Sequence, residues 1–259
     1  MGRFDGKSVI VTGGAMGIGR CIALAFAADG ALVTIADTAV PPSVEVIREI
    51  SQSGLGQAQA IRTDVARSTD ALAAVDKAVA TYGRLDILIN NAGIQPPESN
   101  VTVAELDEGT WDRVIDVNLK GPYLMSKYAI PHLQRAGAGV IVNVASVQGL
   151  QSQRRLPAYA ASKGGLLSLT RNMALDFAPT VRVVAICPGA IETRPVLTGM
   201  PASADERNPM RRMGRPEDVA DAVLFVASSA GSFITGEHLI VDGGYMAIGA
   251  WPPPGSDGS

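Results

Sequence analysis

Short apolar runs recur along the 259-residue chain, separated by longer segments, and this alternation most constrains the fold. The runs are rich in valine and isoleucine and show little polar alternation, which is typical of parallel strands covered on both faces. They are SVIVTGG (8–14), LVTIAD (32–37), AQAIRTD (58–64), ILINNAG (87–93), VIVNVAS (140–146), VRVVAICPG (181–189) and HLIVDGG (238–244). Intervening segments such as 17–30 and 70–86 place apolar residues at helical spacing. The pattern predicts an α/β fold with a doubly wound parallel sheet.

The chain shows no division into smaller units. No linker rich in proline, serine and glycine interrupts it, and there is no internal repeat. We therefore expect one domain over residues 1–250. Residues 190–215 combine several loop formers with little apolar periodicity, and the segment WPPPGSDGS (251–259) is expected to be an extended or disordered tail.

Charge and composition argue against several classes of function. A net charge of −3 offers no basic field for nucleic acid. No apolar run reaches the roughly 18 residues of a membrane span, and the N-terminus lacks the features of a signal peptide, so we expect a cytoplasmic protein. Cys21 and Cys187 lie in apolar segments and are expected to be free thiols. Neither His132 nor His238 has a ligand cluster around it, so no metal site is expected.

A glycine-rich turn follows the first predicted strand. In the segment TGGAMGIG (12–19), Gly13, Gly17 and Gly19 stand where a strand turns into a helix, with Met16 and Ile18 between them. Glycine allows a tight turn and a close ligand, and a helix N-terminus offers free N–H groups and a positive dipole end. The turn is a candidate pyrophosphate site; a glycine-rich turn without a ligand is the alternative.

The second predicted strand ends at Asp37, 18 residues after Gly19. A carboxylate there can accept hydrogen bonds from an adenosine ribose, and it would repel a 2′-phosphate. Thr38 stands where an arginine would favour that phosphate, and Met16 supplies no cation. These residues favour NAD over NADP as the cofactor.

Polar residues also end the next two predicted strands. Asp64 and Val65 suit contacts to an adenine ring, while a helix N-cap is an equally good role for the aspartate. Asn91, Ala92 and Gly93 belong to NNAG (90–93), which suits a backbone that lines a cofactor, although an ordinary turn is possible.

The segment PAYAASKGG (157–165) places Tyr159 and Lys163 four residues apart, on one face of a helix. A neighbouring cation favours the phenolate and lowers the pKa of a phenol, which would suit proton transfer near neutral pH. Ser146, at a strand end, would reach the same edge of the sheet and bind a substrate oxygen. Asn118 could hold a water, bend a helix locally and link Lys163 to solvent. Taken alone, each of these is an ordinary polar residue.

Together these residues resemble the short-chain dehydrogenase/reductase family. The resemblance covers roughly residues 4 to 246 and rests on an ordered set: Thr12-Gly13, Gly17-Ile18-Gly19, Asp37, Asp64, the NNAG segment, Asn118, Ser146, Tyr159, Lys163 and Pro188-Gly189. It implies a single Rossmann domain with seven parallel strands and a catalytic tetrad of Asn118, Ser146, Tyr159 and Lys163. It also implies a homotetramer and cofactor contacts from Tyr159, Lys163, Pro188, Gly189, Ile191 and Thr193, with Thr193 on the nicotinamide carboxamide. Val184 departs from the family's usual asparagine, a change that concerns packing.

The expected function is hydride transfer between NAD and a secondary alcohol, with Tyr159 as general acid and base. Gln148, Gln153, Arg154 and Arg155 precede the tyrosine and are candidate substrate contacts, suited to a sugar or polyol hydroxyl or to an anionic group. A polar loop facing solvent or a subunit contact is the alternative for these four. Alternatives for the whole chain are a ketone reductase, a cofactor-binding regulator without catalysis and a sugar-nucleotide epimerase. The intact Tyr159–Lys163 pair argues against the regulator.

Overall fold

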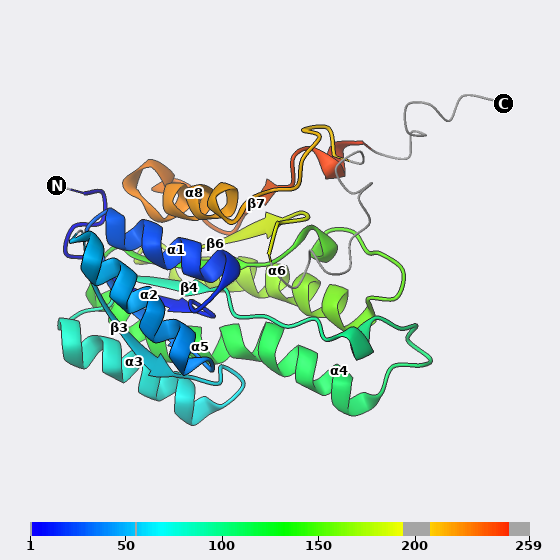
Figure 1. Ribbon diagram of the computed structural model, residues 1–259, viewed down its shortest axis with the longest axis horizontal. Coiled ribbons are helices and arrows are strands. Elements are labelled where there is room, and N and C mark those ends of the chain that lie inside the picture. The colour runs from blue at the N-terminus through cyan, green and yellow to red at the C-terminus, as the bar shows by residue number, and fades with distance from the viewer. Residues whose placement is uncertain (1, 55, 194–207, 249–259) are drawn as a thin grey trace.

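The computed structural model describes residues 2–54, 56–193 and 208–248, and its centre is a seven-stranded sheet (Figure 1). The strands are β1 (Ser8–Thr12), β2 (Leu32–Asp37), β3 (Gln57–Arg62), β4 (Ile87–Asn90), β5 (Gly139–Val144), β6 (Val181–Pro188) and β7 (His238–Val241). Their order is β3-β2-β1-β4-β5-β6-β7, and every neighbouring pair is parallel. All seven predicted strands and the predicted fold class are confirmed.

Helices cover both faces of the sheet (Figure 1). One layer consists of α1 (Gly17–Ala28), α2 (Val40–Ser53) and α8 (Pro216–Ala227). The other consists of α3 (Ser68–Tyr82), α5 (Gly121–Arg135) and α6 (Pro157–Phe177). A further helix, α4 (Glu108–Ile115), runs through a π-helical segment (Asp116–Lys120) into α5. This arrangement is the doubly wound layering that the alternating pattern predicted.

The strand side chains alternate between the two layers. Val9 and Val11 belong to the apolar cluster beneath α1, α2 and α8, whereas Ile10 between them belongs to the cluster beneath α3 and α5. Because both faces of a strand are buried, its sequence contains almost no polar residues. Val184, the departure from the family pattern, is fully buried in the first cluster and packs there as an ordinary core residue.

The strand order reverses at β1, whose neighbours are β2 on one side and β4 on the other. Chain connections leave in opposite directions from such a point and open a crevice beyond the carboxyl ends of the strands. Every predicted site residue that the structure describes lies on a segment at or next to these ends.

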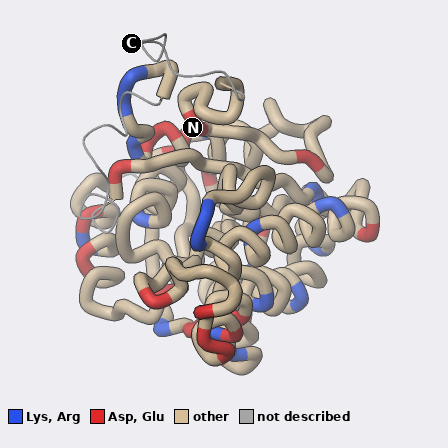
Figure 2. Tube along the Cα trace, turned by 90° about the vertical axis from the view of Figure 1, so that its right-hand side faces the viewer, with Lys and Arg blue, Asp and Glu red and all other residues tan. Residues whose placement is uncertain are grey.

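Charges of both signs are interspersed along the described residues (Figure 2). None of the helices in this part of the chain is long and apolar enough to cross a membrane. Cys21 and Cys187 are free thiols, as expected. Residues 194–207 and the predicted tail 251–259 lie outside the described residues.

Candidate active site

The glycine-rich turn between β1 and α1 is closely packed. Gly13 has a φ of 63°, and a Cβ at this position would lie 2.9 Å from the Cα of Ala92. A Cβ at Gly19 would lie 2.1 Å from the carbonyl oxygen of Gly13. Larger residues would therefore push the turn open.

The N-terminus of α1 is open to a ligand. The N-cap Met16 is extended and makes no side-chain capping bond, and no acidic residue occurs in the first helical turn. The first N–H groups and the positive dipole end are left for an anion. These features fit the pyrophosphate of a dinucleotide.

Asn91 fastens this turn to the end of β4. Its Nδ2 donates to the carbonyl oxygens of Thr12 at 2.9 Å and Gly13 at 3.1 Å. The Thr12 hydroxyl in turn accepts the backbone N–H groups of Asn91 and Ala92. The Asn91 side chain, predicted as a cofactor contact, thus holds the backbone on which a cofactor would lie.

Asp37 is fixed at the end of β2 by two backbone bonds. Its Oδ2 accepts from the Ala15 N–H at 3.0 Å and its Oδ1 accepts from the Ala39 N–H at 2.9 Å. A carboxylate has further lone pairs, so it can still accept hydrogen bonds from ribose hydroxyls. The carboxylate and the glycine-rich turn are thereby held together.

Asp64 does not cap α3, whose N-cap is Arg67. Its Oδ1 accepts from the N–H of Ala66 at 3.0 Å and closes a short turn before the helix. Of the two roles that the sequence left open, the helix N-cap is wrong. Val65 is 5% exposed and packs against Gly121 of α5, where a Cβ would lie 2.7 Å from Val65 Cγ2.

One cavity of about 280 Å³ brings many of the predicted residues together, although Asn118 and Asp37 do not line it. Ser146, Tyr159 and Lys163 line it together with the glycine-turn residue Ile18 and with Asn91, Gly93, Pro188, Gly189, Ile191 and Thr193. Four lining residues that the sequence did not single out are Ile94, Gln95, Val144 and Ala145. Ile94 and Gln95 directly follow NNAG, so their position next to that motif was the available signal.

Lys163 is buried at 5% exposure, and its Nζ donates to the carbonyl oxygen of Val144 at 2.9 Å. Burial lowers the pKa of Lys163 to about 8 because the ammonium loses water contacts. The Nζ lies 5.7 Å from the centre of the Tyr159 ring. The lysine is thus a buried amine that lies beside the tyrosine ring.

Burial raises the pKa of Tyr159, while a hydrogen bond with Ser146 acts in the opposite direction. The sequence predicted a lowered pKa from the neighbouring cation, and for the free protein this direction is wrong. Burial disfavours the phenolate as it disfavours the ammonium. In both groups burial is thus the largest cause of the pKa shift, and it acts against the charged form.

Asn118 lies in the middle of the π-helical segment and is fully buried. Its Oδ1 accepts from the Ile94 N–H at 2.7 Å, and its Nδ2 donates to the Ile94 carbonyl at 2.9 Å and to Ser162 Oγ at 3.2 Å. A Cβ on Gly93 would lie 3.4 Å from Asn118 Oδ1 and 3.5 Å from Lys163 Nζ. Asn118 therefore ties the segment after β4 to the helix that carries Tyr159 and Lys163. Its predicted water stays a prediction.

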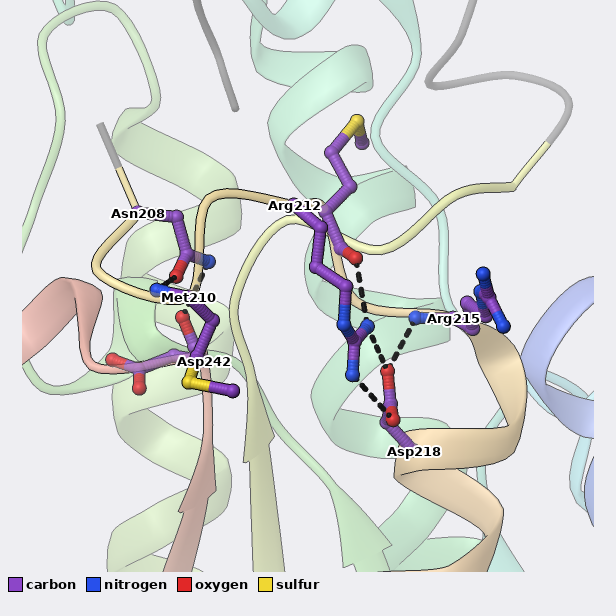
Figure 3. A network of polar contacts seen from close by, with 7 residues as sticks. Asn208, Met210, Arg212, Arg215, Asp218 and Asp242 are labelled. Atoms are coloured by element: carbon purple, nitrogen blue, oxygen red, sulfur yellow. Dashed lines mark hydrogen bonds and ion pairs between the residues drawn. The ribbon is translucent and has the colours of Figure 1, made fainter. Parts of the chain in front are cut away.

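The segment before α8 supports the far wall of the cavity. Ile191 forms a parallel bridge with Gly214. Nearby, Arg212 forms a two-point ion pair with Asp218, whose carboxylate also accepts the Arg215 N–H at 2.7 Å (Figure 3). The hydrogen bonds from Arg212 lower the pKa of Asp218 to about 2. The stretch RRMGR (211–215) directly precedes α8.

A second contact in this region joins the chain to the end of β7. Asn208 Nδ2 donates to the Asp242 carbonyl at 2.9 Å, and Asn208 Oδ1 accepts the Met210 N–H (Figure 3). Thr193, on the cavity side, lies 3.4 Å from the position of a Cβ on Gly17. Thr193, which lines the cavity, thus lies next to the glycine-rich turn.

The four predicted substrate residues do not line the cavity. Gln153 and Arg154 are exposed, and Gln148 is half-buried with an Oε1 that has no partner. Arg155 donates to the carbonyl of Asn100 at 3.3 Å and lies 3.6 Å from a Glu105 oxygen. Its guanidinium therefore braces a neighbouring loop. Arg194, a further arginine that could contact an anionic group, lies outside the described residues.

A parallel sheet in this order, with a glycine-rich turn and a tyrosine–lysine pair at its carboxyl edge, defines the class of Rossmann-fold oxidoreductases. The family model described as enoyl-(acyl carrier protein) reductase matches residues 13–246. With this match and the relatives below, the chain belongs to the short-chain dehydrogenase/reductase family.

The relatives cover nearly the whole chain. The cis-4-hydroxycyclohexanecarboxylate dehydrogenase of Sinomonas cyclohexanicum is 41% identical, covering 95% of this chain and 98% of that protein. The cyclohexanol dehydrogenase of an Acinetobacter strain is 38% identical, covering 95% and 97%. A solved 7α-hydroxysteroid dehydrogenase, in complex with NADH and 7-oxo glycochenodeoxycholic acid, is 34% identical with a TM-score of 0.88, covering 93% and 95%. The chain is therefore an oxidoreductase of this family.

Proposed function

We propose that the protein is an NAD-dependent dehydrogenase of cyclic secondary alcohols. The observation that carries the proposal is the single cavity that Ser146, Tyr159 and Lys163 share with the glycine-turn segment. The relatives named above are dehydrogenases of cyclohexane and steroid compounds. Ile94, which is not among the predicted cofactor contacts, also lines the cavity, and its apolar side chain suits a carbon ring.

The residues divide the work of proton transfer between them. The Ser146 hydroxyl holds the substrate oxygen, and the Tyr159 phenolate takes the hydroxyl proton as the C–H bond breaks. The Lys163 ammonium stabilises that phenolate. The glycine-rich turn, Asp37 and Lys163 would hold a bound NAD, whose nicotinamide would supply the acceptor for the hydride. Positioned proton transfer of this kind gives about 10²- to 10⁴-fold in rate.

The carboxylate of Asp37 supports NAD as the cofactor. Both of its oxygens are fixed by backbone N–H groups, so its negative charge stays beside the expected ribose. A 2′-phosphate would meet that charge. We expect calorimetry to show that NAD⁺ binds more tightly than NADP⁺. Asp37→Ala should reduce the difference between the two affinities. Equal affinity of the two cofactors for the unsubstituted protein would contradict the proposal.

The substrate class is tested by following absorbance of the reduced cofactor with NAD⁺ and a panel of alcohols. The panel contains cyclohexanol, a hydroxycyclohexanecarboxylate, a 7α-hydroxysteroid, an acyclic polyol and a sugar. We expect the cyclic alcohols to be oxidised faster than the polyol and the sugar. The rate should rise with pH, because the phenolate of Tyr159 is the base. NAD⁺ binding without turnover of any compound would favour a regulator instead.

We also propose a homotetramer, as the family resemblance implies. The edge strand β7 and the residues around it expose apolar side chains, among them Phe233, Leu239, Ile240 and Tyr245. Such a surface suits contact with a second copy. Light scattering at micromolar concentration checks the assembly, and a stable monomer would contradict it.

A further inference from the structure

An arginine lies beside Asp37 that comes from another strand. β2 and β3 pair in parallel register, and the partner of Asp37 is Arg62, the last residue of β3. Neighbours in register point to the same face of a sheet. Both residues line a second cavity, of about 160 Å³, between the carboxyl ends of these strands and α2. A cation thus stands at the same end of the site as the carboxylate.

The guanidinium of Arg62 is only loosely held. Its nearest ion-pair partner is Asp70, at 3.9 Å, and its side chain is 64% exposed. The Asp70 carboxylate has other partners as well. The Arg67 Nε lies 3.7 Å from its Oδ1, and the Asp64 N–H donates to its Oδ2 at 3.1 Å. Arg62 therefore has N–H donors free for another anion.

Asp37 does not neutralise this arginine. Both of its oxygens accept backbone N–H groups, and no ion pair among the described residues includes Asp37. Asp37 and Arg62 line one cavity without forming a bond to each other. The two charges would act in opposite directions on a phosphate placed between them.

We propose that Arg62 is a second determinant of cofactor choice, a contact for the 2′-phosphate of NADP(H) that the charge of Asp37 opposes. The inference rests on the proposed nicotinamide site. Arginine binds a phosphate through parallel N–H donors, and such charged hydrogen bonds are strong. Discrimination against NADP(H) then depends on the charge of one residue, and removing that charge lets Arg62 bind the phosphate.

The test is calorimetry of NAD⁺ and NADP⁺ with four proteins: the unsubstituted chain, Asp37→Asn, Asp37→Asn with Arg62→Gln, and Asp37→Asn with Arg67→Gln. Asparagine removes the charge and keeps one of the two acceptors for the N–H groups of Ala15 and Ala39, and this change is common to all three variants. We expect Asp37→Asn to raise the affinity for NADP⁺ by about tenfold or more. The added substitution Arg62→Gln should reverse most of that gain. Arg67→Gln is the matched control, since Arg67 also approaches Asp70 but does not line the cavity.

The single variant Arg62→Gln adds a measurement that leaves the bonds of Asp37 intact. It should lower the affinity for NADP⁺ and leave the affinity for NAD⁺ within about twofold of the unsubstituted protein, because the 2′-phosphate alone distinguishes the two cofactors. The inference is overturned if Asp37→Asn binds NADP⁺ equally well with and without Arg62. If the unsubstituted protein binds neither cofactor, the proposed function is overturned as well. Cofactor binding by the unsubstituted protein therefore distinguishes a failure of the Arg62 inference from a failure of the proposed function.

Discussion

Lys163 should cost the free protein stability at neutral pH, and Lys163→Met tests this. Burial lowers the pKa of the lysine from 10.5 to about 8. The unfolded chain therefore binds more protons than the folded chain between these two values, and folding stability rises with pH across that window. The cost of charging the buried group is about 3 kcal/mol at pH 7 and about 1 kcal/mol at pH 10.

Methionine has a similar length and no charge, so the variant escapes this cost. It also leaves the Val144 carbonyl, which accepts from Lys163 at 2.9 Å, without that donor. An unpaired buried carbonyl costs about 1–3 kcal/mol, and this penalty does not depend on pH. At pH 7 the stability of the variant therefore reflects two opposed effects, the charging cost that it escapes and the unpaired carbonyl that it creates. Only the charging cost varies with pH. Relative to the unsubstituted protein, the variant should lose about 2 kcal/mol of stability between pH 7 and pH 10.

The assay is urea unfolding of both cofactor-free proteins at several pH values and one protein concentration. Lys77→Met, at an exposed position on α3, is the matched control, and subtraction of its pH profile isolates the effect of burial. A difference between Lys163→Met and the unsubstituted protein that stays constant with pH would refute the reasoning. The same variant should lose turnover, because Tyr159 loses its cation.

Three further predictions concern the site and its frame. Tyr159→Phe keeps the ring and removes the proton carrier, so NAD⁺ binding by calorimetry should survive while turnover falls by about 10²- to 10⁴-fold; near-normal turnover would assign the proton to another group. Gly19→Ala would place a Cβ 2.1 Å from the Gly13 carbonyl oxygen. Cofactor affinity should therefore fall, and urea unfolding should show that the free energy of unfolding drops by about 1–3 kcal/mol. Unchanged affinity would mean that the turn does not hold the cofactor. At the opposite edge of the sheet, Asp86 is buried and accepts from Lys7, Arg84 and the Ser8 N–H. Burial opposes ionisation of Asp86, but these bonds outweigh it and lower the pKa of Asp86. Asp86→Ala leaves the buried Ser8 N–H without its acceptor and should therefore cost about 1–3 kcal/mol at pH 7, and less as the pH falls through that lowered pKa; a loss that is independent of pH would contradict the account.

The sequence by itself determined the seven strands, the layering of the helices and the positions of the glycine-rich turn, Ser146, Tyr159 and Lys163. These features follow from local patterns, because apolar period and glycine placement fix which segments form strands and turns. The carboxyl ends of parallel strands then meet at one edge. That rule predicted that Asp37, Ser146 and Tyr159 lie at one edge of the sheet.

Only the tertiary structure decided what surrounds each charge. The β2–β3 register placed Arg62 beside Asp37, although the residues adjacent to Asp37 in the sequence include no arginine. Burial reversed the expected direction of the Tyr159 pKa, and Glu105 with Asn100 engaged Arg155 away from the cavity. Strand pairing and ion pairing join residues that lie far apart in the chain, and burial depends on every element packed around a group. Their outcome depends on distances that no local pattern encodes.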